Sequence, residues 1–169
     1  MIGMREVLFR GKQRDGEKWK FGYFCSFKGS ADIFVPFTEE EEKANEGHIF
    51  SVVGGLWYSV RSETVGQFTG LTDKNGKKIF EGDILRAKVY ETEIEDSPVF
   101  GRNKIRTGNK IDAVWTVEYK NFNASCGYFI YGKDRRFNRL LTYSVIFNNE
   151  CEVIGNVYDN PDLLEADNG

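Results

Sequence analysis

Period-two alternation of apolar and polar residues is the feature that most constrains this chain. Apolar side chains alternate with polar or small ones over residues 18–23, 33–37, 85–89 and 115–119. Successive side chains of a β-strand point to opposite faces, so this pattern is typical of half-buried strands. Four separate segments therefore predict a chain built mainly from short strands.

Glycine-containing turns separate these segments. Arg14-Asp15-Gly16 lies between apolar residues 7–9 and 19–24, and Asp73-Lys74-Asn75-Gly76 lies between 68–71 and 78–80. Asp-Gly and Asn-Gly readily adopt positive φ, which tight hairpins need. The spacing predicts two hairpins and favours a small barrel or sandwich over alternating βα units.

Helical signals are few. Thr38-Glu39-Glu40-Glu41 has the form of a capping box that opens a short helix, which Gly47 would stop. Asn160-Pro161 predicts a helical turn that carries Leu163 and Leu164. Residues 134–145 mix helical spacing with β-forming side chains, and we expect a short helix that runs into a strand.

Composition sets the size and class of the protein. The 169 residues are 40% hydrophobic, 29% charged and 15% aromatic, with a net charge of -3. Such a chain forms one domain or two small ones and buries a core without metals or disulfides. The composition argues against wholesale disorder and against a broadly basic surface, and leaves room for one local basic patch.

The sequence shows no signal peptide or membrane-spanning segment, which bears on the cellular compartment. Charged residues interrupt the first twelve residues before a signal-peptide core can develop, and no apolar run approaches the ~20 residues that cross a bilayer. Cys25, Cys126 and Cys151 lie far apart, which favours reduced thiols. We expect a cytoplasmic protein without membrane contact.

Catalytic and cofactor motifs are not found. His48 is the single histidine, which excludes a His-rich zinc site, and the sequence indicates no metal, cofactor or catalytic residue. Asp73, Glu81 and Asp83 could form an acid–base pair of a hydrolase. The stronger interpretation places them in turns, where carboxylates accept backbone N–H bonds, and we expect no enzyme.

One segment resembles a binding surface. Cations that neutralise phosphates are interleaved there with aromatic rings that could stack on unpaired bases. The candidate nucleic-acid-binding residues are Lys133, Arg135, Arg136, Arg139, Tyr131 and Phe137. The other interpretation is that the rings form core while the arginines lie on a solvated face.

Residues 63–84, ETVGQFTGLTDKNGKKIFEGDI, resemble the signature of the YopX family of bacteriophage and prophage proteins. REVLFRG at 5–11 with Trp19 and Gly22, and VIGNVYDNPDLL at 153–164, resemble the family at both ends. The resemblance implies an all-β protein with a barrel-like (SH3-like) C-terminal part, made in the cytoplasm of a bacterial host. It implies no reaction.

Two subdomains are expected within one compact unit. An N-terminal β-hairpin subdomain would span 1–65, and a small barrel would span 66–165 with a charged insertion at about 91–110, where acidic residues precede basic ones as in a protruding hairpin or loop. The chain also departs from the family around 135–149. We interpret the motif as a fold signature whose turns involve Asp73, Asn75, Gly76, Gly82, Asp83, Gly155 and Asn156.

These observations favour a non-catalytic accessory protein. High aromatic content and the sheet edges of small β-domains suggest binding to an unknown host or phage protein, together with self-association. The alternative is a nucleic-acid-binding module that uses the Lys133–Arg139 patch.

Overall fold

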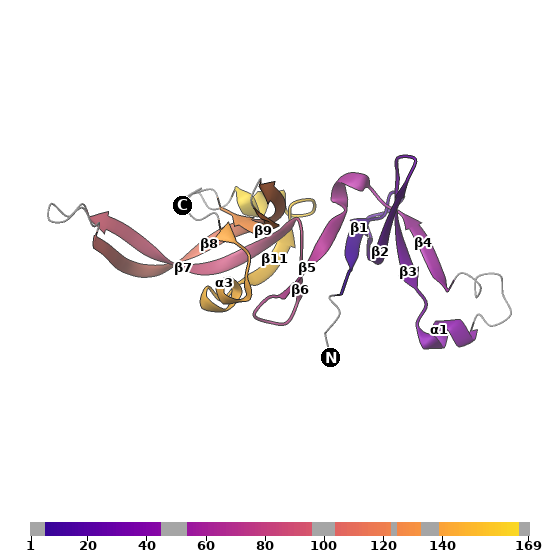
Figure 1. Ribbon diagram of the computed structural model, residues 1–169, viewed down its shortest axis with the longest axis horizontal. Coiled ribbons are helices and arrows are strands. Elements are labelled where there is room, and N and C mark those ends of the chain that lie inside the picture. The colour runs from indigo at the N-terminus through magenta and orange to yellow at the C-terminus, as the bar shows by residue number, and fades with distance from the viewer. Residues whose placement is uncertain (1–5, 45–53, 96–103, 123–124, 133–138, 166–169) are drawn as a thin grey trace. The chain divides into compact units, whose positions relative to one another are not determined.

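The protein folds into two compact units (Figure 1). A computed structural model describes residues 6–44, 54–95, 104–122, 125–132 and 139–165. Unit 1 comprises Met1–Leu71 and Lys78–Gly82, and unit 2 comprises Thr72–Lys77 and Asp83–Gly169. Each unit is built on one antiparallel sheet, and the prediction of an all-β protein is confirmed.

Unit 1 contains a six-stranded sheet in the order β4-β3-β2-β1-β5-β6. The strands are β1 (Phe9–Lys12), β2 (Trp19–Phe27), β3 (Ser30–Pro36), β4 (Gly55–Ser59), β5 (Gly66–Thr72) and β6 (Lys78–Phe80). The helical segments are α1 (Glu39–Ala44) and the 3₁₀ turn η1 (Ser62–Thr64). Both predicted hairpins, β1–β2 and β5–β6, are present.

The core of unit 1 lies on one face of β3. Ala31, Ile33 and Val60 are buried and pack with the partly buried Phe9, Val35 and Val65. Ile33 and Val35 point to the same side because side chains alternate along a strand. The alternation predicted from the sequence at this strand therefore builds the core.

Arg10 joins β1 to β6 within unit 1. Its guanidinium lies 4.9 Å from the Trp19 ring centroid and 5.2 Å from that of Phe80, and it donates a 3.0 Å hydrogen bond to the Glu81 carbonyl. Stacking between rings suits the weakly hydrated guanidinium. The charged side chain of Arg10 thus contributes to the packing of unit 1.

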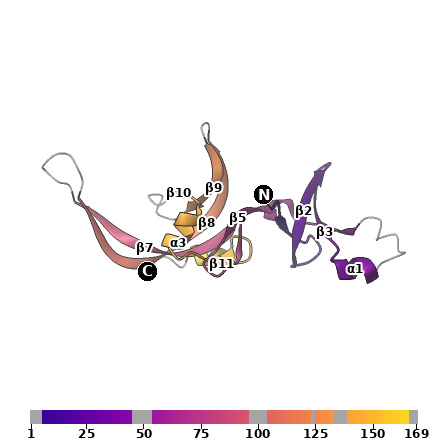
Figure 2. The same ribbon diagram turned by 60° about the horizontal axis from the view of Figure 1, so that its bottom comes forward.

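Unit 2 contains a five-stranded sheet in the order β10-β9-β8-β7-β11. The strands are β7 (Asp83–Glu95), β8 (Lys104–Phe122), β9 (Ser125–Tyr131), β10 (Arg139–Leu140) and β11 (Glu152–Asn156). Helix α3 (Tyr143–Asn148) and the 3₁₀ turn η3 (Pro161–Leu164) complete the unit. The paired β7 and β8 form a long curved ribbon (Figure 2).

One face of this sheet carries the core of unit 2. Leu85 on β7 lies between Trp115 on β8 and Val153 on β11, and all three are buried. Ile146 of α3 is buried as well, and its carbonyl accepts a 3.0 Å hydrogen bond from the Cys151 amide. The chain thus returns from α3 directly into β11.

The barrel expected in the C-terminal part does not close among the described strands. Strands β10 and β11 lie at opposite ends of the strand order, so the sheet of unit 2 is open. The physical reason is that β7 and β8 extend 13 and 19 residues and pair with each other as a ribbon. Barrel closure would require the two edge strands to pair.

The units also divide differently from the expected boundary at residue 65. Strands β5 and β6 belong to the sheet of unit 1 because β5 pairs with β1, with Phe9 opposite Gln67. Of the charged segment 91–110, residues 91–95 lie in β7 and residues 104–110 lie in β8, and residues 96–103 lie outside the described ones.

The helical predictions have mixed outcomes. The capping box is confirmed, since the Thr38 amide donates to the Glu41 carboxylate at 2.8 Å and the Glu41 amide to the Thr38 hydroxyl at 3.3 Å. The turn after Asn160 is confirmed as η3. Of the segment 134–145, for which a helix running into a strand was expected, residues 134–138 lie outside the described ones. The expected strand at its end is wrong: after β10 the chain forms α3, and Thr142 caps this helix by accepting from the Val145 amide. Gly47 lies outside the described residues.

The three cysteines are expected to differ in reactivity. Cys25 and Cys126 are exposed, whereas burial raises the pKa of the Cys151 thiol to about 11. Only the thiolate attacks a disulfide reagent, so Cys151 is protected both by its pKa and by its surroundings. We expect two thiols to react rapidly with a chromogenic disulfide in the native protein and three in denaturant. Rapid reaction of all three in the native protein would contradict the packing of β11.

Candidate functional site

Asp73 is a structural acceptor in the turn that precedes β6. One carboxylate oxygen accepts from the amides of Asn75 and Lys77 at 2.8 and 2.9 Å, and the other accepts from the Val153 amide at 2.9 Å. Its exposed fraction is only 5%. The carboxylate therefore ties this turn to β11 within unit 2, as expected for a carboxylate that satisfies backbone N–H groups.

The other motif residues of this region also serve turns. Gly76 and Gly82 have positive φ values of 82° and 80°, which glycine adopts without strain. Asp83 begins β7 with an exposed fraction of 1%. Glu81 presents its backbone carbonyl 2.5 Å from where a Cβ on Gly66 would lie. The close approach explains why a glycine begins β5.

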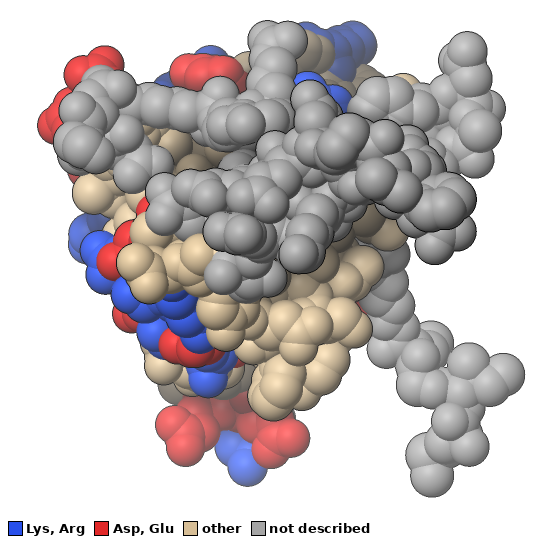
Figure 3. All heavy atoms as spheres, turned by 90° about the vertical axis from the view of Figure 1, so that its left-hand side faces the viewer, with Lys and Arg blue, Asp and Glu red and all other residues tan. Residues whose placement is uncertain are grey.

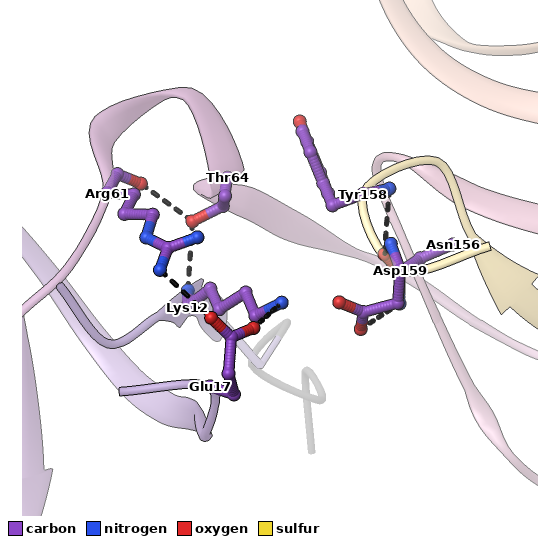
Figure 4. Close-up of polar contacts among 7 residues, drawn as sticks. All are labelled: Lys12, Glu17, Arg61, Thr64, Asn156, Tyr158 and Asp159. Atoms are coloured by element: carbon purple, nitrogen blue, oxygen red, sulfur yellow. Dashed lines mark hydrogen bonds and ion pairs between the residues drawn. The ribbon is translucent and has the colours of Figure 1, made fainter. Parts of the chain in front are cut away.

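Asn156 organises the closing motif (Figure 4). Its side-chain oxygen accepts from the amides of Tyr158 and Asp159 at 3.0 Å each, and its amide nitrogen donates to the Asp159 carboxylate at 2.9 Å. A Cβ on Gly155 would lie 2.5 Å from the Asn160 side-chain oxygen, so the turn folds back closely onto β11. These contacts are those of a local turn.

A second polar cluster closes the β1–β2 hairpin of unit 1 (Figure 4). The Thr64 hydroxyl donates to the Arg61 carbonyl at 2.7 Å and accepts from the Lys12 amide at 2.9 Å. The Glu17 carboxylate forms ion pairs with Lys12 and Arg61, which lower the pKa of that carboxyl group. The cluster holds η1 against β1.

The proposed nucleic-acid patch is only partly described. Lys133, Arg135, Arg136 and Phe137 lie outside the described residues, as does His48. Arg139 pairs with Ile130 across β10 and β9, so Tyr131, the next residue of β9, belongs to the opposite face. The two described members of the patch are therefore not brought together by the sheet register.

Charges on unit 2 are arranged in pairs. Lys74 and Glu152 lie 2.7 Å apart, Lys88 and Asp112 lie 2.5 Å apart, and Lys110 pairs with Glu150. The lysine partners lower the pKa of each of the three carboxyl groups. On the face seen in Figure 3, Lys and Arg lie intermixed with Asp and Glu. In each of these three pairs an acid balances the lysine, which is unlike the basic field that attracts nucleic acids.

The strongest candidate for a binding surface is a row of aromatic side chains on unit 1. Tyr23 on β2 pairs with Phe34 on β3, and Phe34 pairs with Trp57 on β4, so the three share one face of the sheet. The rings of Phe34 and Trp57 lie 4.9 Å apart between centroids. Phe21 and Phe27 extend the row along β2. We call these five residues the aromatic face.

Four of the five side chains of the aromatic face are exposed, and Phe34 is half-buried. The exposed fractions are 48% for Phe21, 56% for Tyr23, 68% for Phe27 and 53% for Trp57. The buried Ile33 follows the opposite alternation from Phe34 and points into the core of unit 1. The face therefore lies on the side of β3 that faces away from this core.

Sequence reasoning missed this surface. Alternation predicted that Phe21 and Tyr23 would be buried on one side of a strand, yet both are about half exposed. A usable signal was present, because Ile33-Phe34-Val35 places large apolar residues on both faces of β3. Such a strand is apolar on both faces, but the core of a small sheet covers only one of them. The other face is left exposed.

Comparison with known families identifies the family of this chain. Residues 8–165 match the family described as YopX protein. The chain belongs to the YopX family. The match spans both units, and the resemblance carried by residues 63–84 is confirmed.

A solved structure is also similar to this YopX protein. It is protein EF1440 from Enterococcus faecalis, which is 20% identical, with 95% of this chain and 99% of that chain covered and a TM-score of 0.45. Comparison with curated proteins gave no match.

The YopX signature of this chain maps to turns and packing. Thr64, Asp73, Gly76 and Gly82 hold turns through the contacts described above. Tyr23, Phe34 and Trp57 lie outside segment 63–84 and outside the two terminal motifs. The interpretation of the motif as a fold signature agrees with these contacts, and the aromatic face is a separate feature.

The described part of the chain contains neither a candidate metal cluster nor a membrane-spanning helix. Among those residues, no group of three or more His, Cys, Asp or Glu side chains is placed to hold a metal ion. Within the same ranges, no helix has both the length and the apolarity to span a bilayer.

Proposed function

We propose that this YopX protein is a non-catalytic module that binds another protein through the aromatic face. The single observation that supports the proposal is the in-register row Tyr23–Phe34–Trp57 on the side of β3 away from the core, in which Tyr23 and Trp57 are exposed and Phe34 is half-buried. Tyr, Trp and Phe are enriched in protein interfaces and dominate their binding energy. Contiguous exposed apolar surface commonly marks such interfaces.

The biological setting proposed is that of a phage- or prophage-encoded accessory protein in the cytoplasm of a bacterial host. The partner would be a host or phage protein, and self-association would accompany or precede its binding. Nucleic acid is the less favoured partner, because Asp32 places a carboxylate on the same face as the aromatic row.

Capture from nuclease-treated host lysate tests this function. We expect the Tyr23→Ala/Trp57→Ala double variant to retain about tenfold less of a specific protein than the wild type, because both changes remove central aromatic anchors. Retained proteins are identified and quantified by mass spectrometry. Light scattering at low and high protein concentration shows whether self-association depends on the same residues.

A matched control removes exposed aromatic rings elsewhere. Tyr143 and Phe147 stack on α3 with exposed fractions of 69% and 70%. The Tyr143→Ala/Phe147→Ala variant should retain the captured protein at the wild-type level. Equal losses in the two double variants, or retention that disappears with nuclease, would argue against the proposed function.

A further inference from the structure

The aromatic face carries one fixed carboxylate. Asp32 lies two residues before Phe34 on β3, so the two share a face, and it is paired with Cys25 on β2 and Ser59 on β4. One carboxylate oxygen accepts from the Ser59 hydroxyl at 2.7 Å and the other from the Ser30 hydroxyl at 2.9 Å. The two serines orient the carboxylate within the sheet surface.

The Asp32 carboxylate can still accept hydrogen bonds from a cation. Within the described ranges, no Lys or Arg forms an ion pair with Asp32. A carboxylate offers about four acceptor sites, and two serine donors fill two of them. The exposed acids of unit 2 described above are paired with lysines, whereas the partners of Asp32 among the described residues are the neutral hydroxyls of Ser30 and Ser59.

The aromatic rings beside Asp32 also favour binding of a cation. The faces of aromatic rings carry negative electrostatic potential, and Trp attracts cations most strongly. Same-face residues on one strand lie about 7 Å apart, so the Asp32 row adjoins the Tyr23–Phe34–Trp57 row. A planar guanidinium stacks on such rings while its N–H groups donate to a carboxylate, which a flexible ammonium does less well.

We propose that the aromatic face binds an extended segment of a partner protein through an arginine side chain that stacks on the Phe34–Trp57 pair and donates to the Asp32 carboxylate. This inference rests on the proposed function and specifies the chemistry of the partner. An extended segment suits the surface because its alternate side chains match the spacing between the rows of the sheet. A phosphate backbone would meet the Asp32 charge with repulsion.

The test uses the full-length chain and labelled synthetic peptides in which threonine alternates with arginine. The matched peptide replaces each arginine by citrulline, which has nearly the same shape and no charge. We expect saturable binding of the arginine peptide, measured by fluorescence anisotropy, and about tenfold weaker binding of the citrulline peptide. This comparison needs no protein variant, so it is independent of any effect on folding.

Charge-matched variants locate the contact. Asp32→Asn should weaken binding of the arginine peptide about tenfold, and Trp57→Ala should weaken it at least as much. Glu63→Gln removes the same charge from another exposed carboxylate of unit 1, which contacts the Ser62 hydroxyl, and should leave binding within about twofold of wild type. Circular dichroism verifies that each variant is folded.

Several outcomes would overturn the inference. Absence of saturable binding by the wild type, equal binding of the citrulline peptide, or equal losses in Asp32→Asn and Glu63→Gln would each do so. Lysate capture that depends on Trp57 but not on Asp32 would also overturn it while leaving the proposed function intact. Trp57-dependent binding of a single-stranded oligonucleotide would overturn both.

Discussion

The Gly22→Ala variant is expected to lose about 4 kcal/mol or more of folding free energy. A Cβ at this position would lie 2.0 Å from the carbonyl oxygen of Phe34 and 2.9 Å from its carbonyl carbon. Both atoms belong to the backbone of β3, so no side-chain rotation relieves the overlap. The two strands would have to separate where Tyr23 pairs with Phe34.

Gly16→Ala is the matched control for this prediction. Gly16 lies in the turn before β2, and no atom outside its chain neighbours lies within 4 Å of a Cβ built there. Its substitution should change the free energy of unfolding by no more than about 0.5 kcal/mol. Urea denaturation followed by far-UV circular dichroism measures both variants. Equal stability of Gly22→Ala and the wild type would show that β2 and β3 are not packed as described.

Removal of the Asp73 carboxylate should be among the most costly single changes in unit 2. Asp73→Ala leaves three backbone amides, those of Asn75, Lys77 and Val153, without their acceptor at a site where the side chain is 5% exposed. Hydrogen bonds to a charged group contribute about 1.5–3 kcal/mol each, and their losses are not additive. We expect a loss of about 4 kcal/mol in the free energy of unfolding, at the upper end of single substitutions.

A graded series separates the contribution of hydrogen bonding from that of charge. Asp73→Asn keeps one acceptor oxygen but turns an NH₂ group toward a donor amide. Its free energy of unfolding should therefore lie between those of the wild type and Asp73→Ala. Asp162→Asn removes a charge from the exposed turn η3 and should be nearly neutral. Thermal and urea unfolding measure the series. A neutral Asp73→Ala would rule out the carboxylate as the link between the turn and β11.

Local patterns in the sequence predicted much of the fold. The alternation at 33–37 and 115–119 and the Asp73–Gly76 turn depend on neighbouring residues only, and the structure contains these strands and this hairpin. Asp73 was also expected to serve a turn, and its contacts within residues 73–77 follow from local spacing. Its third partner, Val153, lies far along the chain and has no local signal.

Properties that depend on distant pairing were harder to predict. Whether the sheet of unit 2 is open depends on which strands form its edges. That β5 belongs to the sheet of unit 1 depends on its pairing with β1. The aromatic face was missed for the same reason, because the exposure of Tyr23 depends on which face of β3 carries the core. Thr142 belongs to the segment 134–145 that was expected to end as a strand, whereas its hydroxyl caps α3.

The alternation of the chain between the two units has a consequence for how the protein can be divided. The polypeptide passes from unit 1 to unit 2 after Leu71, returns at Lys78 and leaves again after Gly82. No single cut yields either unit as one uninterrupted piece, and a fragment that begins at Asp83 lacks the Asp73 acceptor that β11 requires. Genetic exchange that joins the first half of one relative to the second half of another would break this arrangement unless the turn and β11 remained compatible. We therefore expect the two units to be exchanged and engineered together, and the family match extends across both of them.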